Sequence, residues 1–270
     1  MYAPFNLDPS DAYASTLDSL ADGAACRRDI PYLSSLGANV VIITGIDHDR
    51  DHKECMNAFA DAGIYALVKL FDDPKVPYYD QDASSLRASM IDSIAEFPNL
   101  LGLRIIVDEN DPPASMPFYR AATRDMRAYM KKKKYRNIPV FFTLLSEPAG
   151  FPDIPDRAPN DNIDYFWCHD DAPDVLAFWT QHPDGPSACW TREGVRSAVS
   201  FFEDYSIPMV YDKIYCQWNR TGDDDRTFDF ISEAYTSNAK EVLSGSLVAR
   251  YYDVTKSNIT ISEYRDSRDS

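Results

Sequence analysis

An apolar run that ends in two charged residues is the stretch of this sequence with the clearest potential for chemistry. Pro208 precedes a run from Met209 to Tyr211, and Asp212 and Lys213 follow it at once. Such a run is typical of a buried parallel strand, and barrel enzymes hold their catalytic groups at the carboxyl ends of strands. A lysine there can act as a Schiff-base nucleophile if its pocket excludes water. Lys213 is therefore the centre of the candidate site.

Strand and helix patterns alternate along most of the chain and predict the scaffold that presents this end. The predicted helices are Ala24 to Leu36, His52 to Ala62, Ala83 to Phe97, Pro117 to Lys134, Thr191 to Tyr205 and Arg226 to Leu243. The predicted strands are Met1 to Phe5, Asn39 to Thr44, Tyr65 to Leu70, Leu100 to Val107, Pro139 to Leu145, Tyr165 to Cys168, Asp174 to Thr180, the run after Pro208, and Ser246 to Tyr252. No glycine-rich phosphate loop follows a strand, so the pattern favours a (β/α)8 TIM barrel of the α/β class over a Rossmann sheet. We expect a single barrel domain over residues 1–270.

Composition limits the partners of such a domain. The chain has 270 residues, is 44% hydrophobic and carries a formal net charge of -16. Nucleic acid and anionic membranes need a basic surface, so this acidity excludes both classes of partner. The histidines His48, His52, His169 and His182 show no His-x-x-x-His spacing, and we expect no metal and no cofactor.

Several sequence features bear on where the protein works. The chain contains 5 cysteines without a Cys-x-x-Cys pair, and glycosylation sequons begin at Asn219 and Asn258. No signal-peptide or transmembrane pattern is present. We expect a monomeric domain of a secreted or cell-surface protein, trimmed of its signal peptide and of any anchor signal.

The motifs that carry a family likeness extend over nearly the whole chain. They are Leu20 to Leu33, Leu36 to Asn39, Asp51 to Met56, Asp61 to Tyr65, Asn99 to Gly102, Phe118 to Tyr129, Asp164 to Cys168, Arg226 to Phe228 and Ser244 to Ser246. Together they resemble the fungal cell-wall β-1,3-glucanosyltransferases of glycoside hydrolase family 72. The resemblance implies a retaining barrel enzyme with one glutamate as acid/base and another as nucleophile.

Both catalytic positions of that family are substituted here. The acid/base motif falls on residues 106–108, which makes Asp108 the counterpart of the glutamate, or Glu109 after a one-residue slip. The nucleophile motif falls on residues 212–216, which puts Lys213 at the nucleophile and leaves Asp212 beside it. An ammonium cannot form the glycosyl ester and destabilises a cationic transition state. Asp212 should not simply inherit the role, because neighbours on a strand point to opposite faces.

The resemblance also implies positions that contact the sugar, and most of them are rewritten. The substrate-contacting positions are Thr44, Lys69, Trp179, Gln181, Tyr211, Tyr215 and Arg250. Lys69 and Arg250 replace family residues of other types, and Arg104 is a further candidate to point into the barrel. The helices and turns keep the family pattern while the pocket floor does not.

Three functions follow from this pattern. The first is a pseudoenzyme that binds β-1,3-glucan or another cell-wall glycan. The second is an active transglycosylase or hydrolase that uses Asp108 or Glu109 with a displaced carboxylate such as Asp212. The third is a barrel that binds an anionic small ligand through Lys213, Lys69 and Arg250. In the first case Lys213 forms a structural ion pair with Asp108.

The resemblance also implies disulfides. Cys26 and Cys55 match a family bridge that ties the first helix to the next. Cys216 lacks its usual partner, and Cys189 is the candidate to replace it. Cys168 is then left as a free thiol.

Overall fold

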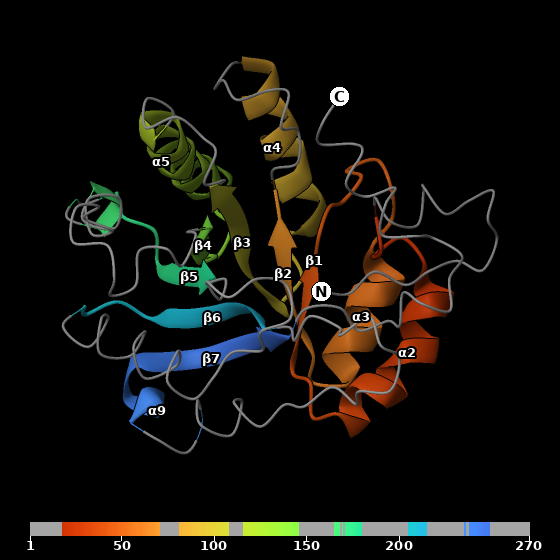
Figure 1. Cartoon of the computed structure of the whole chain (residues 1–270). Helices are drawn as coiled ribbons and strands as arrows, with labels where there is room; N and C mark the ends of the chain where they lie inside the picture. The colour runs from red at the N-terminus through yellow and green to blue at the C-terminus, as the bar shows by residue number, and fades with distance from the viewer. Residues whose placement is uncertain are drawn as a thin grey trace, which may run out of the picture.

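The computed structural model describes residues 18–70, 81–107, 116–145, 165–167, 169, 171–179, 205–214, 235 and 238–248. Within them, a 7-stranded sheet runs in the order β1-β2-β3-β4-β5-β6-β7, and every neighbouring pair is parallel (Figure 1). The strands are β1 (Val40–Ile43), β2 (Tyr65–Lys69), β3 (Leu100–Val107), β4 (Val140–Leu145), β5 (Val175–Trp179), β6 (Met209–Ile214) and β7 (Leu243–Val248). The helices are α2 (Gly23–Ser35), α3 (Lys53–Asp61), α4 (Gln81–Ile94), α5 (Met116–Lys133) and α9 (Ala239–Val242). None of these helices combines the length and the apolar character needed to cross a bilayer.

The alternation of strand and helix that the sequence predicted is confirmed from α2 to β4. The expected strand Met1 to Phe5 and the expected helix Thr191 to Tyr205 fall almost entirely outside the described residues, as does most of the helix expected from Arg226. In Figure 1 the sheet is strongly curled, with β6 and β7 turned across the direction of β2 and β3, and α2 to α5 lie outside it. The fold is that of the predicted (β/α)8 TIM barrel.

The strand predicted from Tyr165 to Cys168 is wrong, because residues 165–167 are helical. β4 already pairs with β3 on one side and with β5 on the other, so it offers no free edge to another strand. Instead, the buried Phe166 packs against Phe142 of β4, with the ring centroids 4.2 Å apart. Tertiary packing overrides the strand preference of these aromatic residues.

The bounds of β6 and β7 also differ from the prediction. β6 does not finish at Asp212 and Lys213 but continues to Ile214, which pairs with Val248. β7 begins at Leu243 and not at Ser246, because Leu243 pairs with Met209. The neighbouring strand supplies hydrogen bonds that outweigh the weak strand propensity of the Ser-Gly-Ser stretch.

The two faces of the sheet pack against different surroundings. Side chains on the outer face join those of the helices in one large cluster, which includes Ile43, Val68 and Phe142. Side chains on the inner face form a small lumen cluster of Ile42, Leu67, Phe141 and Leu247. Because Ile42 comes from β1 and Leu247 from β7, the lumen cluster extends from one outermost described strand to the other. This grouping agrees with the curl of the sheet.

The corner formed by α2 and α3 is fixed by covalent and polar contacts. The predicted disulfide between Cys26 and Cys55 is confirmed, with the two Cα atoms 5.4 Å apart. His52 of the α3 N-cap places Nε2 2.9 Å from Oδ2 of the buried Asp18, which also accepts the backbone N–H of Asp47. These contacts join α2, α3 and the loop after β1 into one unit.

The contacts at the turn into β3 explain why an asparagine stands at position 99 and a glycine at position 102. The buried Asn99 donates from Nδ2 to the carbonyl oxygens of Met56 at 2.9 Å and Ile64 at 3.2 Å. Gly102 leaves space for Phe141, whose ring carbons would lie 2.6 Å from a Cβ at this position. This glycine therefore allows the ring of Phe141 to fill the lumen.

A polar clasp joins α4 to α5 on the outer surface. Asp92 accepts hydrogen bonds from Lys133, Tyr129 and Tyr135, at 2.7, 2.8 and 2.8 Å. Burial tends to raise the pKa of Asp92, but these three donors outweigh it and hold the pKa below the usual value. The same carboxylate raises the pKa of Lys133.

Candidate functional site

The carboxyl ends of parallel strands meet at one edge of the sheet, and several predicted site residues lie there. Lys69 and Trp179 are the last residues of β2 and β5, and Thr44 directly follows β1. Asp212 and Lys213 lie near the carboxyl end of β6. The structure therefore brings these five positions to the edge at which barrel enzymes carry their sites.

Several other predicted site residues cannot be compared with the structure. They lie outside the described residues and are Asp108, Glu109, Gln181, Tyr215, Arg250, Cys189 and Cys216. Cys168 lies outside them too. At Trp179, Asp212 and Lys213 only the backbone is described. Their assigned roles stay predictions.

The pairing of β6 with β7 is irregular at the candidate nucleophile position. Tyr211 pairs with Ser246 and Ile214 pairs with Val248, so β6 has one more residue than β7 between the two pairs. This register shift spans Asp212 and Lys213. Such an irregularity interrupts the alternation of side chains between the two faces of a strand. It therefore removes the argument that Asp212 and Lys213 point to opposite faces.

Tyr211, which the resemblance assigned to the substrate, is buried in the structure. Its side chain is 3% exposed and packs edge to face against Phe178 of β5, with the ring centroids 5.1 Å apart. The preceding residue, Val210, packs against the lumen cluster. Alternation along this part of β6 therefore sets Tyr211 on the outer face of the sheet. A direct contact between Tyr211 and a ligand in the lumen is not favoured by this position.

A buried arginine is the main polar feature of the described lumen. Arg104 of β3 is 1% exposed and donates from Nε to Oγ1 of Thr143 on β4, at 2.8 Å. Lys69 is half-buried, and its Cα is the register partner of Arg104. The sequence indicated Arg104 only as a candidate to point into the barrel. It gave no indication of Thr143, because a hydrogen-bond partner on a neighbouring strand leaves no signal in the local sequence.

A possible cation site lies in the loop after β1. Asp47, His48 and Asp49 bring potential ligand atoms within 4.8 Å of one another. Both aspartates are exposed, and the backbone N–H of Asp49 donates to Oδ1 of Asp47 at 3.1 Å. That hydrogen bond is an ordinary feature of a turn, so the cluster needs no ion to explain it.

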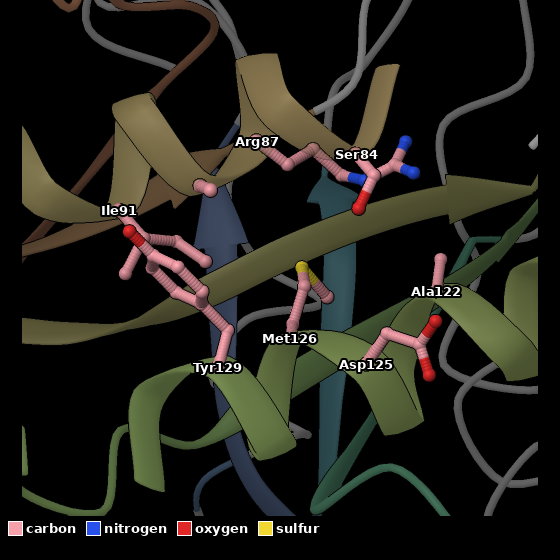
Figure 2. A pocket seen from close by; sticks show the side chains of 8 residues that line it. Ser84, Arg87, Ile91, Ala122, Asp125, Met126 and Tyr129 are labelled. Atoms are coloured by element: carbon pink, nitrogen blue, oxygen red, sulfur yellow. The ribbon is translucent and has the colours of Figure 1, made fainter. Parts of the chain in front are cut away.

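A shallow groove lies between α4 and α5, away from the strand ends. Figure 2 shows side chains from both helices around it, with Arg87 and Ser84 on one wall and Asp125, Met126 and Tyr129 on the other. The groove has a volume of about 260 Å³ including its open mouth. All of its lining residues belong to the two outer helices, so it is a seam of the barrel wall and not part of the lumen.

Comparisons with known proteins agree with the geometry. Residues 3–268 match the model of a glycoside hydrolase family described as glucanosyltransferase. The 1,3-beta-glucanosyltransferase gas1 of Schizosaccharomyces pombe is 30% identical over 267 residues, which cover 93% of this chain and 46% of the relative. The 1,3-beta-glucanosyltransferase GAS2 of Saccharomyces cerevisiae is 31% identical over 249 residues, with 88% and 42% covered. This chain thus spans about half the length of the curated relatives that it matches.

The fold of this chain also resembles the solved structure of a relative. Saccharomyces cerevisiae Gas2p in complex with laminaritriose and laminaritetraose superposes with a TM-score of 0.74 at 28% identity. The match covers 89% of this chain and 55% of that one. Fold, motifs and matched length agree, and the chain belongs to glycoside hydrolase family 72, the glucanosyltransferases.

Proposed function

We propose that this chain binds β-1,3-glucan on a family 72 barrel without transferring it. The residue that carries the proposal is Lys213 of β6, which the family resemblance assigns to the position of the nucleophile. A retaining mechanism needs two carboxyl groups about 5–5.5 Å apart, one of which attacks the anomeric carbon. An ammonium in place of that carboxylate removes the covalent step.

The buried charge of the lumen supports the same proposal. Arg104 holds a guanidinium inside the barrel, and Lys69 adds a second cation on the neighbouring strand. The transition state of glycoside transfer develops positive charge at the anomeric carbon. A cation placed near that carbon would oppose this charge, whereas it would not prevent hydroxyl groups from binding.

The ligand class comes from the relatives. A solved relative is described in complex with laminaritriose and laminaritetraose, which are β-1,3-linked glucose oligomers. The preserved scaffold supports binding of a similar glycan by this chain. The proposal includes a secreted or cell-surface location, because the glycan ligand lies in the cell wall. It also includes a monomeric state.

A second candidate function is an active transglycosylase that uses a displaced carboxylate. The register shift between Tyr211 and Ile214 favours it, because a local irregularity in β6 changes the geometry around Asp212. In this version Asp108 or Glu109 serves as the acid/base. The two candidates differ in one observable, which is the formation of products.

The test incubates the purified chain with reduced laminari-oligosaccharides and measures products and binding on the same sample. Mass spectrometry reads the chain lengths, and calorimetry reads the heat of binding. Cello-oligosaccharides of equal length are the control for the β-1,3 linkage. We expect heat with laminari-oligosaccharides, no heat with the control and no change in chain length.

Each other outcome overturns a stated part of the proposal. Longer and shorter products would establish the displaced carboxylate and contradict the loss of catalysis. Equal heats with both sugars would contradict selectivity for the β-1,3 linkage. The absence of heat and products would overturn both candidate functions.

A further inference from the structure

Three of the described helices end in the same backbone motif, the Schellman motif. In each, two backbone N–H groups just past the helix donate to the carbonyl oxygens three and five residues earlier, and one residue adopts a left-handed conformation. That residue is Gly37 after α2, Gly63 after α3 and Lys134 after α5, with φ angles of 70, 70 and 61°. A side chain strains a left-handed backbone, so the motif favours glycine. At the end of α5 a lysine therefore stands where the fold favours glycine.

The last turn of α5 also differs from those of the other long helices in the described part of the chain. It carries Lys131, Lys132 and Lys133, whereas the last turns of α2, α3 and α4 contain no basic residue. Cations at the end of a helix interact favourably with its dipole, but this effect is modest and confined to the last turn. Three other helices of the same barrel form without it. The fold therefore does not require four consecutive lysines at this point.

Most of the cations at this helix end have no carboxylate partner. Lys133 is the exception, because it contacts Asp92 at 2.7 Å. Among the described residues, no carboxylate forms an ion pair with the exposed Lys131, Lys132 or Lys134. Salt ions from the solvent then balance these three charges, and a bound polyanion can displace such ions.

These cations lie at the amino ends of the strands. Residues 136–139 lead from α5 into β4, and the exposed Arg136 donates from Nη2 to the carbonyl oxygen of Leu100, the first residue of β3. We define the basic patch as Lys131, Lys132, Lys134 and Arg136. The patch and the carboxyl edge, which holds the candidate site, are therefore at opposite ends of the barrel.

We propose that the basic patch binds an anionic polysaccharide, a thin chain with carboxylate or phosphate groups repeated along its length. Weak contacts of several cations with one chain reinforce one another, because each contact holds the next group close. Exposed charges more than about 10 Å apart are screened at 0.1 M salt, so a thin chain responds mainly to the patch. A membrane or a DNA duplex is broader and would also meet other surfaces of a protein with a net charge of -16. The choice of a glycan rests on the proposed function, whereas the patch does not.

The test is calorimetry on the full chain with oligogalacturonate, laminari-oligosaccharides and poly-L-glutamate as separate probes of equal length. We expect oligogalacturonate to bind at low ionic strength with an affinity that falls as salt is added, because binding releases counterions. Laminari-oligosaccharides should not compete with it, because the two sites are at opposite ends of the barrel. Poly-L-glutamate should bind more weakly, since its flexible backbone loses more conformational freedom on binding.

A variant of Lys134 separates binding from folding. Lys134→Gly removes one charge but places the favoured residue at the left-handed position. We expect a higher urea midpoint together with an affinity for oligogalacturonate about two- to fivefold lower, the loss that corresponds to one exposed ion pair. The double variant Lys131→Gln and Lys132→Gln should lose more affinity. The matched control is Lys53→Gln, which removes an exposed lysine at the start of α3 and should leave the affinity unchanged.

The outcomes also separate this inference from the proposed function. A lower midpoint with unchanged affinity in Lys134→Gly would show that Lys134 serves the fold, and it would overturn the inference. An equal loss of affinity in Lys53→Gln would overturn it too, because binding would then follow net charge. Equal binding of poly-L-glutamate would contradict the choice of a glycan. Binding of laminari-oligosaccharides alone would overturn the patch and leave the proposed function in place, whereas binding of oligogalacturonate alone would support the patch and contradict the proposed function.

Discussion

The α2–α3 corner and the barrel lumen relate to the family pattern in opposite ways. In the corner, Cys26, Cys55 and His52 match the family pattern and make a disulfide or a buried hydrogen bond. In the lumen, Lys69 is a position where the resemblance implied a residue of another type, and the buried Arg104 lies beside it. The corner meets needs of the fold. Under the proposed function, the lumen of the family serves the chemistry, and this chain has given up that chemistry while keeping the fold.

The largest effect is expected from removing the disulfide of the corner. Cys26→Ser together with Cys55→Ser should lower the free energy of unfolding by about 2–4 kcal/mol, because the bridge closes a loop with a sequence separation of 29 in the unfolded chain. Urea unfolding followed by circular dichroism measures the change. The wild-type chain and the double variant, both in reductant, are the control pair and should match, because reductant also opens the predicted bridge of Cys189 with Cys216. An unchanged midpoint would show that the corner does not need its covalent link.

The next largest effect is expected at Gly102, where packing inside the lumen contributes to stability. Gly102→Ala should lower the free energy of unfolding by about 1–3 kcal/mol, since the new Cβ would lie 2.6 Å from the ring of Phe141. Gly245→Ala is the matched control, because no atom lies within 4 Å of a Cβ there. We expect the control to stay within about 0.5 kcal/mol of the wild type in the same urea experiment. Equal losses in both variants would contradict the steric argument.

A smaller and pH-dependent effect is expected from the clasp of α4 and α5. The pKa of Asp92 is lowered in the folded chain, so its stabilisation is present above the unfolded value of about 4 and is lost as the pH falls through the folded value. Asp92→Asn should lower the free energy of unfolding by about 1 kcal/mol at pH 7, with a difference that shrinks toward about pH 2.

Urea unfolding across this pH range measures the difference. Glu96→Gln makes the same charge change at an exposed position nearby and serves as the control. A pH dependence in Asp92→Asn identical to that of the wild type would show that the clasp does not contribute.

The smallest effect is expected from restoring one catalytic residue. Lys213→Glu alone should not produce transglycosylation of laminari-oligosaccharides, because Lys69, Arg250 and the other positions at which the chain departs from the family resemblance remain. Mass spectrometry of the products checks this expectation. Measurable chain-length redistribution would show that Lys213 was the only barrier, and it would remove the contrast between corner and lumen.

The sequence determined the elements and the family of this protein. Mostly apolar runs such as Leu100 to Val107 predicted buried parallel strands with accurate bounds, because burial on both faces leaves a local pattern. Helix positions and the bridge of Cys26 with Cys55 also followed, the latter from the family resemblance. These features depend on residues close in sequence or on a motif that local residues carry.

Only the tertiary structure decided how the strands meet. The hydrogen bond of Arg104 to Thr143, the register shift around Lys213 and the early start of β7 at Leu243 all depend on a neighbouring strand. The helical residues 165–167 depend on the fact that both edges of β4 are already paired. Pairing and packing between segments far apart in the chain outweigh local propensity, so no local pattern could have revealed them.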